Sequence, residues 1–187
     1  MPAITTNDLK TGITLELDNG LFQVVDFQHV KPGKGGAFVR TKLRNVRSGA
    51  VLERTFNAGV RVEQAIVERQ DMQFLYRDGD DYVFMNTSTY DQMTVPRTAL
   101  GPAADYLVEQ AVAQIATYQG EIIGVEIPAS VELVVAQTEP GVQGDRVSGA
   151  RKPAVLETGK TVQVPLFVET GDRIKVDTRT GDYITRV

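Results

Sequence analysis

MQFLYRDGDDYVFMN, residues Met72–Asn86, has the pattern of two short strands joined by a tight turn. Aromatic and β-branched residues, which strands favour, stand on both sides of Asp78-Gly79, and both turn residues tolerate the positive φ of a hairpin. A calcium loop at Asp78–Asp81 is the alternative, but the alternating ligands and the closing Glu of an EF-hand are missing. We therefore predict a β-hairpin here.

The same pattern recurs along most of the chain. Strand-like runs are ITLELDNGLFQVVDF, AFVRTKLRNV, VELVVAQTEPG, KTVQVPLFV and DRIKVDTRTGDYITRV. Asp18-Asn19-Gly20 and Thr180-Gly181 supply further hairpin turns. Many short strands at this spacing indicate small barrels or sandwiches, so the chain is predicted to be mainly β.

One segment breaks the pattern. Pro102–Tyr118, PAADYLVEQAVAQIATY, places Leu107, Ala111 and Ile115 four residues apart, as on one helical face. Gly101-Pro102 would start this helix and Gly120 would end it. We predict one short helix that packs on a small barrel.

Charge divides the 187 residues into three segments, predicted as modules of residues 1–64, 65–127 and 128–187. Residues 1–64 hold nine Lys or Arg against six Asp or Glu, net +3, whereas residues 65–127 hold three against ten, net -7. Residues 128–187 hold eight of each, net 0, so the formal charge of -4 conceals a polarised molecule. Three small modules in a row would share little core.

Composition argues against an enzyme. Cys is absent, which excludes disulfides, thiolate nucleophiles and Cys-ligated zinc, and His29 is the single histidine. A Ser-His-Asp triad would have to use His29, beside a predicted hairpin, so we expect a partly exposed strand-end residue. The start lacks an apolar signal region, and no apolar run approaches the ~18 residues of a membrane helix. We expect a soluble, cytoplasmic protein without metal or cofactor.

His29–Arg47, HVKPGKGGAFVRTKLRNVR, carries six Lys or Arg and no Asp or Glu. Its Gly-rich turn would present Lys34 at a tip without bulky neighbours. Arg40, Lys42 and Arg44 alternate, so they would share one face of a strand. Such a row of cations is typical of contacts to an RNA phosphate backbone.

Composition alone leaves the role of Lys34 open. A solvated turn lysine and an RNA contact both fit, whereas a nucleotide-binding P-loop does not, because GxxxxGK[ST] and a following helix are missing. The polar loop Gly144–Lys152 has three cations, and the C-terminal hairpin adds Arg179, Tyr183 and Arg186. These residues are either ordinary surface residues or a second RNA-binding surface.

Motifs in all three segments carry a resemblance to bacterial translation elongation factor P. They are KPGKGGAF in the first segment, FLYRDGDDYVFMN in the second, and EPGVQGDRVSGARKPAVLETG, VQVPLFVETGDRIKVDTRTG and GDYITRV in the third. Each Gly-rich turn is common by itself, but here all occur in the family's order and at matching distances. The chain resembles this family along essentially its full length.

The resemblance implies a KOW/SH3-like barrel followed by two OB-type barrels, in an L-shaped arrangement similar in outline to transfer RNA. It implies a cytoplasmic, monomeric translation elongation factor without enzymatic activity or membrane contact. Such a factor binds the 70S ribosome between the peptidyl and exit tRNA sites, where peptidyl tRNA and ribosomal RNA are its partners. There it promotes peptide-bond formation and relieves stalling at consecutive prolines.

The resemblance also implies roles for single residues. Lys34 would be the loop tip that many members modify, reaching toward the CCA end of peptidyl tRNA, with a Lys34-modifying enzyme as a further partner. The residues that would support the loop are Lys31, Pro32, Gly33, Gly35 and Gly36. Gly144 and Asp145 match the family's Gly-Asp-Thr loop, in which Arg146 replaces Thr, and Tyr183 and Arg186 match RNA-contacting tail positions.

Two alternatives stay open. The chain could be a stand-alone RNA-binding KOW or OB protein, which would bind naked RNA tightly and with a strong salt dependence. It could also be a divergent paralogue of elongation factor P with another ribosomal task.

Overall fold

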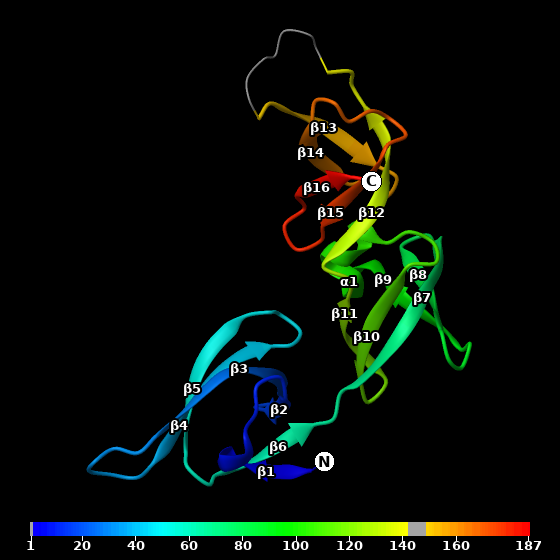
Figure 1. Ribbon diagram of the computed structural model, residues 1–187. Coiled ribbons are helices and arrows are strands. Elements are labelled where there is room, and N and C mark those ends of the chain that lie inside the picture. The colour runs from blue at the N-terminus through cyan, green and yellow to red at the C-terminus, as the bar shows by residue number, and fades with distance from the viewer. Residues whose placement is uncertain (1, 142–148) are drawn as a thin grey trace. The chain divides into compact units, whose positions relative to one another are not determined.

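The computed structural model describes residues 2–141 and 149–187. Three antiparallel sheets dominate it (Figure 1). The chain packs as two compact units, Met1–Arg69 with Ala116–Gly124, and Gln70–Ile115 with Val125–Val187. The prediction of a mainly β chain is confirmed, whereas the module boundaries after residues 64 and 127 stay a prediction.

The first unit is built on a six-stranded sheet in the order β1-β6-β2-β3-β4-β5. Its elements are β1 (Ala3–Thr5), the 3₁₀ helix η1 (Thr6–Asp8), β2 (Thr14–Leu17), β3 (Gly20–Val30), β4 (Phe38–Asn45), β5 (Val51–Asn57) and β6 (Arg61–Ala65). Its core contains Leu15, Val24, Val39 and Leu43, all fully buried. The predicted Asp18-Asn19 turn is confirmed, with φ of 48° and 62°, values that both residue types tolerate.

The β3–β4 hairpin is long and its loop is exposed. Paired residues run from Phe22↔Asn45 to Val30↔Phe38, with a bulge between Val24 and Asp26. Residues 31–36 between the strands are all exposed. In Figure 1 this loop extends beyond its sheet at the blue end of the hairpin. The pairing therefore carries the loop away from the core of its unit.

The second sheet has the order β11-β10-β7-β8-β9. Its strands are β7 (Glu68–Asp78), β8 (Asp81–Asn86), β9 (Gln92–Pro96), β10 (Val112–Tyr118) and β11 (Glu121–Glu126). The hairpin predicted for Met72–Asn86 is confirmed, because Asp78 pairs with Asp81 and Gly79 has a φ of 62°. Phe74 and Phe84 pair across it, both buried, with ring centroids 5.5 Å apart.

The helix predicted over Pro102–Tyr118 is wrong in extent. The structure has one α-helical turn, α1 (Arg97–Leu100), and a 3₁₀ helix, η2 (Gly101–Tyr106), and Val112–Tyr118 is strand β10. Gln110, at a φ of 73°, breaks the helical path, and the Ala111 carbonyl accepts a hydrogen bond from the Phe74 amide. Ala113 and Ile115 are buried while Val112 is exposed, which is the two-residue period of a strand. The four-residue spacing that suggested a helix is accidental.

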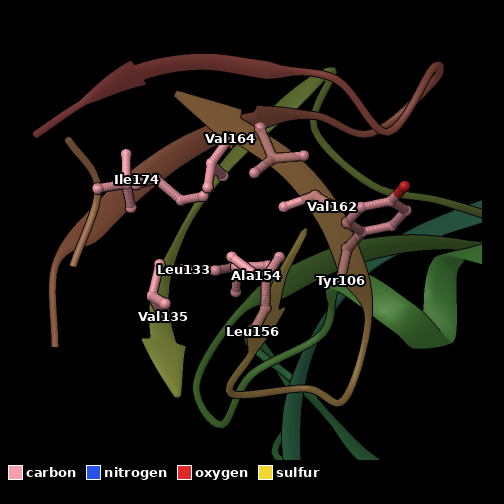
Figure 2. Close-up of a cluster of buried hydrophobic side chains, with 10 residues drawn as sticks. Tyr106, Leu133, Val135, Ala154, Leu156, Val162, Val164 and Ile174 are labelled. Carbon is pink, nitrogen blue, oxygen red and sulfur yellow. The ribbon is translucent and has the colours of Figure 1, made fainter. Parts of the chain in front are cut away.

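The third sheet has the order β14-β13-β12-β15-β16. Its strands are β12 (Ser130–Thr138), β13 (Arg151–Leu156), β14 (Thr161–Pro165), β15 (Arg173–Asp177) and β16 (Tyr183–Arg186). Tyr106 and Val168, both buried in this core, lie outside the strands of the sheet. Figure 2 shows the Tyr106 ring of η2 entering the cluster formed by residues such as Leu133, Leu156 and Ile174.

Tyr106, from the segment predicted as the middle module, therefore packs in the core of the third sheet. The expectation that the modules share little core stays a prediction. Its side chain is 5% exposed. Beside it, the Thr158 hydroxyl donates a hydrogen bond to the Asp105 carbonyl at 2.5 Å. The apolar spacing in the sequence does not reveal this contact, because it depends on which residues the η2 turn directs inward.

Candidate nucleic-acid interface

Strand β4 carries three cations on one exposed face. Along Phe38–Asn45 the residues alternate, so that Val39, Thr41 and Leu43 are buried. The exposed residues between them include Arg40, Lys42 and Arg44. The buried Thr41 hydroxyl donates to the Arg54 carbonyl of β5 at 2.6 Å, which satisfies it inside the sheet. The predicted shared face is therefore present.

Neighbouring strands add carboxylates that the basic stretch itself lacks. Lys42 pairs with Asp26 on β3 and with Glu53 on β5. These side chains line a shallow pocket of about 230 Å³. Sequence reasoning missed both acids, because only the strand register brings them beside Lys42. Both acids therefore lie near Lys42, although within residues 2–141 and 149–187 neither forms an ion pair with it.

The outer two cations have neutral neighbours in the ladder. Arg40 pairs with Gln28 and Thr55. Arg44 pairs with Gln23 and Val51. Both guanidinium groups are therefore better placed than the Lys42 amine to meet a phosphate group.

Lys34 lies at the exposed end of the hairpin. Gly35 beside it has a φ of +100°, a conformation that a side chain disfavours, and Gly33, Gly35 and Gly36 have open space around the position of a Cβ atom. Within residues 2–141 and 149–187, no carboxylate forms an ion pair with Lys34. Lys31 and Pro32 at the loop entry are also exposed. The structure thus leaves the Lys34 amine accessible.

His29 and Phe27 form an edge-to-face pair at the base of this loop, with ring centroids 5.5 Å apart. His29 pairs with Val39 and its residue is exposed, as expected for a strand end. Phe27 packs partly against the core of the unit. The pair lies at the root of the hairpin, where the exposed His29 adds an aromatic ring to the surface.

Arg47 lies in the turn after β4 and is already paired. Its Nη2 atom is 3.0 Å from Oε2 of Glu121. In the same unit the Tyr118 hydroxyl lies 3.3 Å from Oε2 of Glu16. Burial and the Glu16 carboxylate raise the pKa of Tyr118 above its ordinary value. These contacts connect the β10–β11 turn to the first sheet, so Arg47 has a structural partner.

Of the predicted loop Gly144–Lys152, the structure describes only residues 149–152. Gly144, Asp145 and Arg146 lie outside the described residues. Lys152, expected as an exposed cation of this loop, is instead 7% exposed in β13. Its Nζ atom donates to the Glu139 carbonyl at 2.5 Å. Lys152 is therefore a buried structural lysine, and its two-residue spacing from the buried Ala154 and Leu156 is the signal in the sequence that could have revealed it.

The predicted C-terminal residues differ in environment. Tyr183 is half-buried and packs against the third core. Arg186 is exposed, with its guanidinium over the ring of Phe167. Arg179 hydrogen-bonds the Asp177 carboxylate and thereby lowers the pKa of that carboxyl. Phe167 was missed from sequence, since an aromatic residue in a strand-rich run is expected to be buried.

Two further features bear on the kind of site. Over residues 2–141 and 149–187, no group of three or more His, Asp or Glu side chains could hold a metal ion. In the same described ranges, no helix has the length and apolarity to cross a membrane.

Three family models match the chain. The elongation factor P KOW-like domain matches residues 5–62, and the elongation factor P OB domain matches residues 67–125. The C-terminal model of elongation factor P matches residues 131–186. The predicted combination of a KOW-like domain with OB-type folding is confirmed by these matches.

Relatives are similar along nearly the whole chain. Elongation factor P of Streptomyces avermitilis is 60% identical over 184 residues, which cover 98% of each chain. Elongation factor P of Pelotomaculum thermopropionicum is 56% identical, over 98% of this chain and all of its own.

A solved structure of eukaryotic translation initiation factor 5A from Methanococcus jannaschii has a TM-score of 0.54. It is 24% identical and covers 66% of this chain and 93% of its own. At this level of identity the likeness shows a shared fold.

Proposed function

This chain belongs to the elongation factor P family, and from that premise we propose that it promotes peptide-bond formation on ribosomes stalled at consecutive prolines. As a translation elongation factor it acts with the ribosome. We place its binding site between the peptidyl and exit tRNA sites, with peptidyl tRNA and ribosomal RNA as direct partners.

The observation that carries the proposal is the exposed Lys34 tip beyond the cationic face of β4. Lys34 is accessible between two glycines, and Arg40 and Arg44 lie on the strand that follows its loop. Arginines on a rigid strand suit phosphate groups, and the extended hairpin lets the amine reach further than the body of the sheet. We assign Lys34 to the CCA end of peptidyl tRNA.

The contribution of Lys34 would be positional. The ribosomal RNA centre performs the chemistry, and proline is a poorly oriented substrate there. Holding the end of peptidyl tRNA in a reactive geometry removes part of the entropic barrier to bond formation. No group of this chain needs to donate or accept a proton for that role.

Translation of a proline-run reporter in a reconstituted system tests the proposal. Wild-type protein is expected to relieve stalling and Lys34→Ala to lose most of that relief. Lys10→Ala removes an exposed lysine from the turn before β2 and serves as the matched control. An inactive wild-type protein would refute the function, whereas a fully active Lys34→Ala would refute only the tip assignment.

Binding experiments separate the two alternatives. A stand-alone RNA-binding protein would bind naked RNA tightly, with a steep dependence on salt. We expect weak binding to naked RNA and clear binding to 70S ribosomes. A divergent paralogue would bind ribosomes without rescuing the proline reporter.

We further propose that the primary amine of Lys34 is the acceptor for an amine-linked modification. The exposed, Gly-flanked loop gives a modifying enzyme access from several sides. Intact-mass measurement of protein from its native host, against Lys34→Arg from the same host, tests this. Equal deviations from the calculated masses would refute it.

A further inference from the structure

Phe167 is an exposed aromatic residue in the connection from β14 to β15. Its residue is 56% exposed, while Val164 before it and Val168 after it are fully buried. The buried valines anchor the connection and leave Phe167 facing outward. A single exposed apolar residue is common on protein surfaces, so its exposure alone indicates nothing.

The position of Arg186 makes Phe167 informative. The central guanidinium carbon of Arg186 lies 5.0 Å from the centroid of the Phe167 ring. That is within the ~6 Å range of a cation–π contact. On another side, Nη1 of Arg186 lies 3.6 Å from Oδ2 of Asp172. Asp172 is itself held, since the same oxygen accepts a hydrogen bond from the Glu169 amide at 2.9 Å.

These contacts orient the guanidinium before any partner arrives. A free arginine side chain loses about 2 kcal/mol of rotamer entropy when it is fixed. The ring and the carboxylate limit the conformations of Arg186 in advance, so less entropy is lost on binding. The long, exposed pair with Asp172 is weak and can be exchanged for a phosphate group.

We propose that Phe167 is a positioning residue that holds Arg186 as a stacking platform for an unpaired RNA nucleotide. A planar guanidinium over an aromatic ring presents one flat face to a base and its N–H edge to a phosphate. The proposal rests on the proposed function, in which ribosomal RNA is a direct partner of the chain. We commit to small-subunit RNA as the occupant, because Arg186 supplies the positive charge that phosphate requires.

A double-mutant cycle tests the coupling by affinity for 70S ribosomes. Phe167→Ala and Arg186→Ala are each expected to weaken binding by about fivefold, and the double variant by no more than either. Additive losses would overturn the proposal, because they would mean that Phe167 acts without Arg186. Ile184→Ala removes another exposed apolar side chain from β16, 48% exposed, and should leave affinity unchanged. An equal loss with Ile184→Ala would indicate an apolar protein partner and overturn the RNA assignment.

Phe167→Trp gives a direct optical test, because the chain contains no other Trp. This variant should retain wild-type affinity, and a nucleotide that stacks on the Arg186 guanidinium beside the indole should quench its emission, measured as the difference from wild-type protein with the same 30S subunits. Adding Arg186→Ala should remove most of the quenching. Unchanged emission at saturating 30S subunits would overturn the proposal.

The test also separates this proposal from the general function. If wild-type protein fails to bind ribosomes, the proposed function fails, and single-stranded poly(A) replaces 30S subunits as the probe for Phe167→Trp. Quenching that depends on Arg186 would then support the platform, and its absence would refute it. Circular dichroism melts of every variant exclude unfolding as the cause of a loss.

Discussion

Lys42 and Glu53 stand directly opposite each other on β4 and β5, with Asp26 paired to Lys42 on the other side. The ladder therefore places two carboxylates opposite the centre of the cationic row and none opposite Arg40 or Arg44. Opposite charges at directly opposite positions of two strands stabilise a sheet by roughly 0.2–1 kcal/mol relative to an Ala–Ala pair. Lys42 therefore differs from Arg40 and Arg44 in its cross-strand partners, although the three residues look equivalent along the strand.

We predict that Arg40→Ala and Arg44→Ala each weaken 70S binding by roughly fivefold and reduce the salt slope by about one. Lys42→Ala should have a smaller effect, because the carboxylates of Asp26 and Glu53 lie near its charge. Affinity measured over a series of KCl concentrations checks this. A larger loss for Lys42→Ala than for either arginine would contradict the ranking.

Gly35→Ala is expected to reduce reporter relief by roughly fivefold, equivalent to about 1 kcal/mol of backbone strain at the tip. The cause is the φ of +100° at Gly35, since open space around the position excludes a clash. Gly33→Ala, also in open space but without positive φ, is the matched control. Equal activity of the two variants in the proline reporter would show that the loop conformation is irrelevant.

Tyr106→Ala is expected to lower the free energy of unfolding by about 3–5 kcal/mol, because it empties a site in the third core. Tyr106→Phe retains the ring and should cost about 1 kcal/mol or less. Tyr90→Ala removes a tyrosine that is 71% exposed and should change little. Urea unfolding of the three variants tests the ranking, which equal midpoints would refute.

Alkaline pH should destabilise the protein through Tyr118. Its pKa is raised, first by burial and then by Glu16, so the folded protein favours the neutral phenol. That stabilisation is complete below the ordinary tyrosine pKa of about 10 and is lost as pH rises through the folded pKa. The ionisation of Tyr118 is measured by absorbance at 295 nm during a pH titration. Subtracting the titration of Tyr118→Phe from that of wild type isolates this residue among the six tyrosines.

Glu16→Gln should lower the pKa of Tyr118 only partly, because burial remains after the charge is removed. In Tyr118→Phe, the loss of stability above pH 10 should be smaller than in wild type. An unshifted Tyr118 titration in Glu16→Gln would contradict the contact between these two side chains.

Local chemistry was sufficient for much of the fold. Asp18-Asn19 and Asp78-Gly79 accept positive φ, so their turns could be predicted from the residues themselves. The alternation of Arg40, Lys42 and Arg44 likewise placed them on one face, since strand geometry has a strict period of two. The same local reasoning failed at Pro102–Tyr118, where apolar residues satisfied a helical and a strand period together and pairing with Phe74 settled the outcome.

Contacts between distant residues follow from register and packing, which no local pattern contains. Asp26 and Glu53 beside Lys42, and Tyr106 inside the third core, exist because hydrogen-bonded strands and a buried turn bring them there. Phe167 lies outside the core because its neighbouring valines occupy the inward positions, and Arg186 returns over it on β16. Residue types and their spacing thus specify the turns, the two faces of each strand and the accessibility of Lys34. Strand register and packing, which exist only in the folded chain, decide which residues lie beside each charge.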